Sequence, residues 1–476
     1  MPLTLVPTMT RAIRRAAVAC ALAVGALLAL AGPAAAHAEL VSSSPSNGAV
    51  VSSEPQQVTL LFSEKLTLSL STVKVIGPDG HRVDSGAPRA AGAEEDGLTV
   101  DLAAGAPQGT FILDWLATAD DDGHSTSGVI TFSVGAPSRT TAAAGFGARD
   151  RWTDAVLDLS VWLGFAGLAL LVGLAAIRLH CAPRAVGGTG VAGLRWPATL
   201  GWATVLAGTL VQLFVYGPST QGQSLAHTFD RSLLSATLAT HQGHLLEARI
   251  VLLALVAAVG EVVLRRARGE VAGAVLALAL AATWSGISHA SSGTQVPLAL
   301  VVTTLHVTAM ALWAGGLFTM GVLLTREAGA ELGATTARFS RLALTAVTAL
   351  VVTGLYQAWR EVGSLSALTG TSYGRLLLVK AGVFLLVIAV AAGTRARVAR
   401  QREHGALALR RGVLLELAGV TAVLVVTVLL ISNAPGRTVQ QSHLTGDARG
   451  YSKAAAAARS ASTTVSGSYG AGSPGR

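Results

Sequence analysis

The segment PLALVVTTLHVTAMALWAGGLFTMGVLLT, residues 297–325, has no Asp, Glu, Lys or Arg in 29 consecutive positions. A transmembrane helix needs about 20 apolar residues, so this segment predicts a helix that crosses the bilayer with some tilt. Across the 476 residues, 51% are hydrophobic and only 13% are charged, whereas soluble domains average about 25% charged residues. The composition excludes an ordinary soluble enzyme, and it is too apolar for a disordered chain.

Other apolar segments of similar length lie on both sides of residues 297–325. Each is long enough to span the hydrocarbon core of a membrane. They cover residues 153–177, 195–216, 246–264, 271–288, 339–360, 375–394 and 411–432. The sequence therefore predicts an all-α polytopic membrane bundle of about eight helices over residues 153–432.

Arginine residues predict how this bundle is oriented. If the chain before residue 153 lies outside the cell, Arg residues gather in the inner connections at 178–195, 265–268, 326–341 and 395–411. The outer connection at 289–296 contains none. Because positive charge favours the cytoplasmic side, we expect a multi-pass protein of the cell membrane with its N-terminal region outside. The Ala-, Ser- and Gly-rich tail at 433–476 is expected to be a disordered extracytoplasmic segment.

The first 36 residues are typical of a secretory signal peptide. Three arginines, the last of them Arg15, precede an apolar run, and Ala34-Ala35-Ala36 forms a small-residue cleavage site. An uncleaved first helix is the alternative. Cleavage after Ala36 would make His37 the mature N-terminus.

Residues 37–136 have a different composition from the rest of the chain. From 37 to 135 there are thirteen acidic and four basic residues, so this region attracts cations and is not expected to bind nucleic acid. Short β-branched runs separated by turn residues predict a small antiparallel β-sandwich or barrel. These runs are 57–62, 72–76, 98–102, 109–115 and 128–134. Residues 137–152 read as a linker.

The residues with metal-binding chemistry in this region are His37, His81 and His124, with Asp120, Asp121 and Asp122. The mature chain would contain a single cysteine, Cys181, which excludes a disulfide framework and a Cys-rich metal cluster. Imidazole and carboxylate ligands without thiolate suit Cu(II) or Zn(II). Asp122-Gly123-His124 alone is a weak signal, since surface loops often contain such a pattern. A mature N-terminal His37 strengthens it, because its α-amine and imidazole can chelate one metal ion.

Two stretches of this region resemble the bacterial copper-resistance domain CopC. They are HAELVSSSPSNG at 37–48 and ADDDGHSTSGVITFSV at 119–134. The resemblance implies a cupredoxin-like, Ig-like β-sandwich that binds one Cu(II) through the amine and imidazole of His37, with His124 and Asp122. No methionine lies between His37 and Gly135. The methionine-rich Cu(I) site of some family members is therefore not expected here.

Several polar and sulfur-containing side chains lie in or beside the predicted spans. His306 lies inside the span at 297–325, and Met310 follows one helical turn later on the same face. His289 ends the preceding span, and His241 and His244 precede another span on the same predicted outer side. These residues form a candidate copper path, in which the Met310 thioether would suit Cu(I). The alternative is that they pack or form hydrogen bonds between helices.

The membrane half resembles the CopD family. The matching pieces, in chain order, are Leu305-His306, Trp313 to Leu317, Arg338 to Arg341, Tyr373 to Lys380 and Glu416. The resemblance implies a copper-handling membrane protein, with copper import as the expected activity. No ATP-binding motif accompanies it.

Other functions remain open at this stage. A copper buffer or sensor would need the front domain but no transport. A haem-bearing membrane reductase would need paired histidines at matching depth, and an N-terminal histidine chelate also occurs in copper monooxygenases. We expect no enzymatic activity. The expected partners are copper ions, the lipid bilayer and an extracytoplasmic copper chaperone or reductase.

Overall fold

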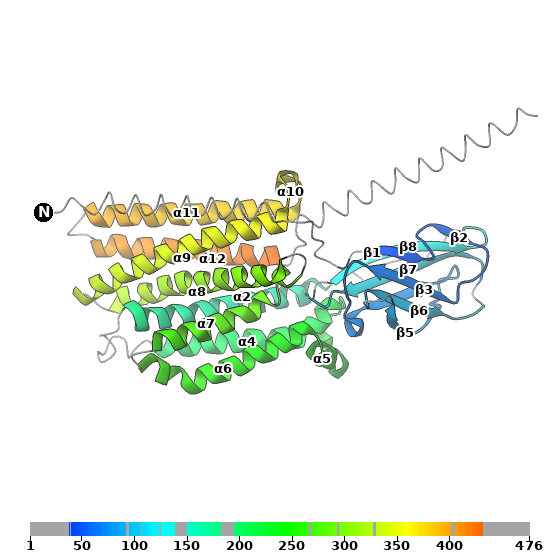
Figure 1. Cartoon of the computed structure of the whole chain (residues 1–476), viewed down its shortest axis with the longest axis horizontal. Helices are drawn as coiled ribbons and strands as arrows, with labels where there is room; N and C mark the ends of the chain where they lie inside the picture. Colours follow the sequence, from blue (N-terminus) through cyan, green and yellow to red (C-terminus); the bar gives the residue numbers. More distant parts are fainter. Residues whose placement is uncertain are drawn as a thin grey trace, which may run out of the picture.

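The computed structural model has a β-sandwich at one end of a long helical bundle (Figure 1). It describes residues 38, 40–91, 95–105, 107–121, 123, 125–138, 150–181, 195–265, 269–292, 295–326, 330–400 and 405–431. The predicted signal peptide at 1–36, most of the linker and the tail at 433–476 lie outside the described residues.

The sandwich consists of two four-stranded sheets, with strand orders β1-β3-β6-β5 and β2-β8-β7-β4. The strands are β1 (Leu40–Ser44), β2 (Ala49–Val51), β3 (Gln57–Phe62), β4 (Thr72–Ile76), β5 (Asp84–Ala91), β6 (Gly97–Leu102), β7 (Gly109–Thr118) and β8 (Ser125–Val134). Alternate residues of β3 face inward, so that Val58, Leu60 and Phe62 are buried. Phe111 and Phe132 stack between β7 and β8, with ring centroids 5.0 Å apart.

All five strands predicted from the sequence are present, and the three that were not predicted are edge strands. Strand β5 contains Gly86 and Pro88, which weaken a strand pattern but are tolerated at a sheet edge. Strand β2 has only three residues, and it pairs with β8 in parallel. The predicted all-antiparallel arrangement is therefore wrong at this edge, because β1 and β2, which are close in sequence, pair in different sheets.

The helical bundle follows the sandwich in sequence. Its helices are α2 (Arg151–Ala176), α4 (Arg195–Thr220), α5 (Arg231–Leu238), α6 (His241–Arg265), α7 (Gly269–Ser285), α8 (Val296–Arg326), α9 (Ala330–Val362), α10 (Leu365–Gly370), α11 (Ser372–Arg400) and α12 (Gly405–Ile431). Short turns lie at η1 (Leu68–Leu70), η2 (Ile177–Cys181), η4 (Leu225–His227) and η5 (His289–Ser291).

Among the described residues, six helices are long and apolar enough to cross a membrane: α2, α4, α6, α8, α9 and α11. Shorter apolar helical segments lie in α7 and α12, at Gly269–Ser285 and Leu415–Leu430. Each of the eight predicted spans thus contains a helix, and in six of them the described residues alone are long and apolar enough to cross a membrane. The predicted count of eight spans is therefore not established.

Helix α8, which contains the segment quoted first, is the most enclosed of the six. In the apolar stretch of α8, 67% is buried inside the protein, whereas in that of α11 only 11% is buried. A Cβ atom added at Gly315 of α8 would overlap the backbone of Ala169 in α2, so only glycine allows this approach. Close packing of this kind places α8 in the core of the bundle, where its polar side chains face other helices.

Candidate metal centre and its junction with the membrane helices

The predicted ligands His37, Asp122 and His124 lie outside the described residues, but their neighbours are described. Ala38 is fully buried, and its carbonyl accepts a hydrogen bond of 2.7 Å from the Thr126 hydroxyl. This contact ties the residue after His37 to the second residue after His124. Within the described residues, no group of three His, Cys, Asp or Glu side chains is arranged to hold a metal ion.

The loop at 119–124, which joins β7 to β8, is anchored within the sandwich on its β7 side. The Thr67 hydroxyl donates to the Asp120 carboxylate at 3.1 Å, and the Asp120 amide donates to the Lys65 carbonyl at 3.0 Å. At the other end, the hydroxyls of Thr118 and Ser125 lie 2.9 Å apart. We call residues 119–124 the junction loop.

The junction loop contacts the helical bundle through two of its carbonyl groups. The buried Tyr216, near the end of α4, donates its hydroxyl hydrogen bond to the Gly123 carbonyl at 2.7 Å. The Ser291 hydroxyl, in η5, donates to the Asp121 carbonyl at 3.0 Å. Gly123 has φ +72°, and a Cβ atom there would lie 2.8 Å from the Gln242 side chain at the start of α6. Three separate segments of the bundle thus meet the loop that contains Asp122.

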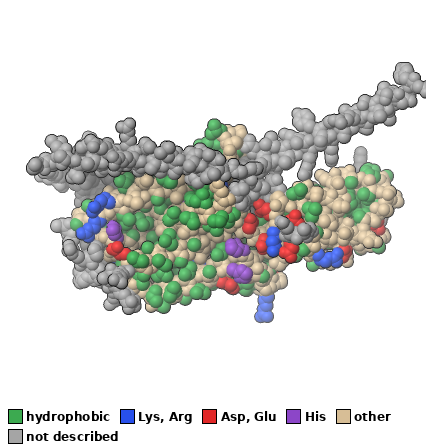
Figure 2. Space-filling model, in the orientation of Figure 1, with side chains coloured by type: hydrophobic (Ala, Val, Ile, Leu, Met, Phe, Trp, Pro, Cys, Tyr) green, Lys and Arg blue, Asp and Glu red, His purple; other side chains and the backbone are tan. Residues whose placement is uncertain are grey.

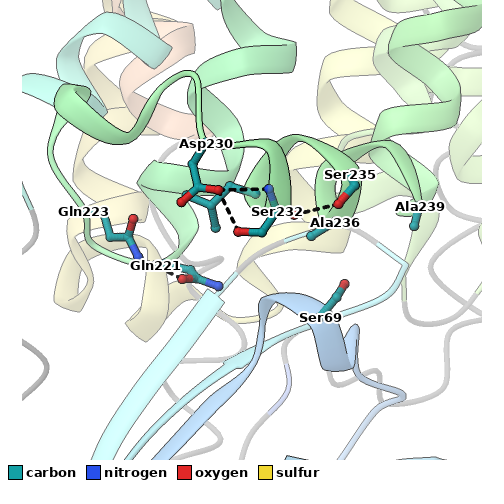
Figure 3. A pocket seen from close by; sticks show the side chains of 9 residues that line it. Ser69, Gln221, Gln223, Asp230, Ser232, Ser235, Ala236 and Ala239 are labelled. Carbon is teal, nitrogen blue, oxygen red and sulfur yellow. Dashed lines mark hydrogen bonds between the residues drawn. The ribbon is translucent and has the colours of Figure 1, made fainter. Parts of the chain in front are cut away.

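A polar cleft of about 450 Å³ lies beside this contact. Figure 3 shows Ser69 of the sandwich on one side and Asp230, Ser232 and Ser235 on the other. The Ser232 hydroxyl and amide both donate to Asp230 and lower the pKa of its carboxyl group. The carboxylate therefore stays charged at neutral pH and gives this cleft a negative charge.

The predicted outer histidines of the bundle occupy different environments. His289 is buried in η5, the same turn that contains Ser291, and its carbonyl accepts a 2.6 Å hydrogen bond from Arg360. His241 is exposed at the start of α6 and lies 3.2 Å from the Gly286 carbonyl, and His244 is also exposed. Figure 2 shows histidine side chains at the end of the bundle nearest the sandwich.

His306 and Met310 lie deeper, on α8. His306 is ten residues from Val296, which corresponds to about 15 Å along the helix axis. Its Nδ1 lies 2.8 Å from the Thr353 hydroxyl of α9, and this hydroxyl itself donates to the Ala349 carbonyl at 2.6 Å. Met310 is half-buried and packs against the main core of the bundle. The imidazole is thus held between α8 and α9.

Some residues of the junction could not be identified from sequence patterns. Tyr216 and Ser291 contact the junction loop through ordinary hydroxyl groups, which carry no motif. Arg360 fixes the turn that contains His289 by donating to the carbonyls of His289 and Ser292.

Arg249 did have a sequence signal, since it lies within an apolar span, where a charged residue is expected to have a function.

This architecture defines a multi-pass membrane protein with an all-β domain packed against one end of its helices. Comparison with known families agrees with each part of the chain. Residues 40–135 match the CopC domain, residues 152–296 match the copper resistance protein D-like N-terminal domain, and residues 333–430 match copper resistance protein D. The chain therefore contains a CopC domain followed by the two CopD-type parts, in the arrangement of a CopC–CopD fusion.

Similar proteins cover different parts of the chain. Copper transport protein CutJ of Bacillus subtilis (strain 168) is 27% identical over 386 residues, which are 78% of this chain and 70% of CutJ. Copper resistance protein C of Escherichia coli is 34% identical over 116 residues, 23% of this chain and 90% of that protein. The crystal structure of PcoC, a methionine-rich copper resistance protein from Escherichia coli, is 34% identical. It covers 21% of this chain and 99% of PcoC, with a TM-score of 0.18.

Proposed function

We propose that this protein imports copper across the cell membrane. The sandwich takes up Cu(II) outside the cell and passes it to the helical bundle at the junction loop. Membership in the CopC and CopD families supports copper handling. The similarity to a copper transport protein over 78% of the chain favours transport over storage.

The observation that carries this proposal is the contact between the junction loop and the bundle. Asp121 and Gly123 each accept a hydrogen bond from a bundle side chain, and Asp122 lies between them in the sequence. A copper ion held by Asp122 would therefore be released next to the bundle. A front domain that served only as a buffer would have no need for this contact.

The proposed capture site consists of the amine and imidazole of His37, the imidazole of His124 and the carboxylate of Asp122. Nitrogen and oxygen ligands of this kind favour Cu(II), and the Irving–Williams order places Cu(II) above Zn(II). The hydrogen bond from Thr126 to the Ala38 carbonyl supports this grouping, because it brings the chain next to His37 to the start of β8.

The proposed path continues from His289 in the buried turn η5 to His306 and Met310 inside α8. Copper loses hydration as it enters, so each depth must supply replacement ligands. His241 and His244 would offer alternative ligands at the surface. If Met310 binds Cu(I), one electron must come from an extracytoplasmic reductant, or a copper chaperone must deliver Cu(I) directly. The arginine distribution supports an extracytoplasmic sandwich.

Copper uptake into proteoliposomes of defined orientation tests the proposal. The double variant Tyr216→Phe, Ser291→Ala removes the two bundle hydroxyl groups that donate to the junction loop. We expect it to bind one Cu(II) with unchanged affinity and to import copper at least fivefold more slowly than the wild type.

The matched control is Tyr356→Phe. This variant removes another buried tyrosine hydroxyl, which donates to Gln295 at 3.2 Å and does not touch the sandwich. Equal uptake rates for the double variant and the wild type would contradict transfer at the junction loop. A wild type that loads Cu(II) but never accumulates copper inside the vesicles would instead be a buffer or a sensor.

A further inference from the structure

Arg249 is a charged side chain in the interior of the helical bundle. It lies eight residues after His241, at the start of α6, which is about 12 Å along the helix axis. It belongs to a segment long and apolar enough to cross a membrane, and its exposed fraction is 0%. It is the largest of the fully buried side chains in the described part of the chain.

The partners of Arg249 are all electrically neutral. Its Nε donates to the Thr283 hydroxyl at 2.9 Å, and its Nη2 donates to the Thr283 carbonyl at 3.3 Å. Its Nη1 lies 3.5 Å from Gln212 Oε1, and its guanidinium carbon lies 3.6 Å from the centre of the Trp284 ring. No carboxylate pairs with Arg249 among the residues that the structure describes. These contacts fix the orientation of the guanidinium group but leave its charge uncompensated.

Two of the residues that contact Arg249 also have N–H groups that donate no hydrogen bond to any described residue. Gln212 Nε2 and Trp284 Nε1 are buried and have no hydrogen-bond partner in the described structure. Gln212 is 3% exposed and Trp284 is 7% exposed. Gln212 uses its amide oxygen towards Arg249, while Trp284 stacks on Phe165 with ring centroids 5.7 Å apart. The cluster thus combines a full positive charge with two unsatisfied N–H groups.

Each of these features is unfavourable in a protein interior unless an acceptor is present. A buried charge without a counter-charge loses its hydration, and a buried N–H without an acceptor loses its hydrogen bond to water. A single anion that reached the guanidinium and both free donors would satisfy all three groups. A monovalent anion fits best, because it gives a net charge of zero. Its desolvation cost is also lower than that of a divalent anion, since this cost rises with the square of the charge.

We propose that Arg249, Gln212 and Trp284 form a binding site for a small inorganic monovalent anion, with chloride as the physiological ligand. The site is separate from the copper path through His306, which lies between α8 and α9. It uses α4, α6 and α7 instead. Bound chloride neutralises a fixed positive charge that would otherwise oppose a copper cation entering the same bundle.

Chloride binding to the purified full-length protein tests this proposal directly. Chloride-35 NMR in detergent, with gluconate holding the ionic strength constant, should show saturable line broadening above the detergent blank. Arg249→Gln should reduce this broadening at least tenfold. The matched control is Arg151→Gln. Arg151 also lies over an indole ring, that of Trp152 at 5.4 Å, but it is exposed, so its removal should change nothing.

Tryptophan fluorescence locates the site within the protein. Iodide should quench a saturable component of the emission, chloride should reverse this quenching, and Trp284→Phe should remove the component. Gln212→Leu keeps the guanidinium and should raise the half-saturating chloride concentration at least threefold. This second variant keeps the test valid if Arg249→Gln does not fold. The absence of saturable chloride broadening in the wild type, or equal broadening in folded Arg249→Gln, would overturn the proposal.

Discussion

The sandwich and the helical bundle bury their polar groups in different ways. In the sandwich, alternate residues of each strand face the core, and the predicted metal ligands lie in sequence at the N-terminus and in a loop at the edge. In the bundle, polar groups such as Arg249 and His306 lie between helices and form hydrogen bonds with side chains of neighbouring helices. The sandwich therefore suits capture from solution, whereas the bundle offers ligands only at fixed depths.

Inside the bundle, α8 and α11 differ in how far they are buried. Helix α8 is enclosed and contains the proposed path, whereas α11 is mostly exposed and suits contact with lipid. Substitutions in the two helices should therefore differ in effect even when the chemical change is the same. The predictions below use such pairs, and they run from the largest expected effect to the smallest.

The largest effect is expected from adding one methyl group to α8. In Gly315→Ala, the new Cβ would overlap the Ala169 backbone and force α2 and α8 apart. We expect the melting temperature in detergent to fall by more than about 10 °C, because overpacking and lost helix contacts add together. Gly382→Ala in α11 is the control, since no atom lies within 4 Å of its new Cβ. Its melting temperature should stay constant or rise slightly. Equal destabilisation by both variants would contradict the central position of α8.

Removal of the deep imidazole should abolish transport without affecting capture. In His306→Ala, copper loses its only proposed nitrogen ligand inside α8, so we expect no copper accumulation above background while the sandwich still binds Cu(II). His289→Ala should slow uptake less, because His241 and His244 lie on the same side. Cellular copper content under limiting copper, at matched expression, measures both effects. Normal accumulation in His306→Ala would make this residue a packing residue.

Substitutions in the proposed capture site should weaken Cu(II) binding to the sandwich, which the bundle variants leave intact. We expect His124→Ala to lower the Cu(II) affinity of the 37–136 domain at least a hundredfold, and Asp122→Ala about tenfold, because imidazole is the stronger ligand for Cu(II). Competition titrations measure the affinities, and electron paramagnetic resonance should show less nitrogen hyperfine structure in His124→Ala. The domain is a reasonable unit to express alone, since copper resistance protein C matches it over 90% of its own length. Unchanged affinity in His124→Ala would exclude this residue as a ligand.

The smallest effect should come from the residue that orients His306. Thr353→Val removes the hydroxyl group 2.8 Å from Nδ1, so the imidazole loses its fixed orientation but remains in place. We expect copper uptake to fall two- to fivefold. Thr348→Val, also on α9, removes an exposed hydroxyl that donates only to the Leu344 carbonyl, and uptake should not change. Identical uptake in both variants would show that Thr353 does not position the imidazole.

The sequence determined much of this protein by local patterns. Short β-branched runs bounded by turn residues predicted β3, β4, β6, β7 and β8. The edge strands β1, β2 and β5 escaped prediction because they are short or contain Gly and Pro. Long apolar segments predicted the eight long helices but not α5 or α10, since spanning a bilayer requires length and hydrophobicity. The choice of His37, Asp122 and His124 as ligands follows from the resemblance of residues 37–48 and 119–134 to CopC. They remain predictions.

Only the tertiary structure decided which residues meet one another. Tyr216, Gln242 and Ser291 come from three separate segments, and no sequence spacing links them to the junction loop. The neutral surroundings of Arg249 likewise arise from α4, α6 and α7 together. The physical reason is that hydropathy fixes the length of a helix but not its neighbours. Close contacts such as that between Gly315 and Ala169 select those neighbours through packing between residues far apart in the chain.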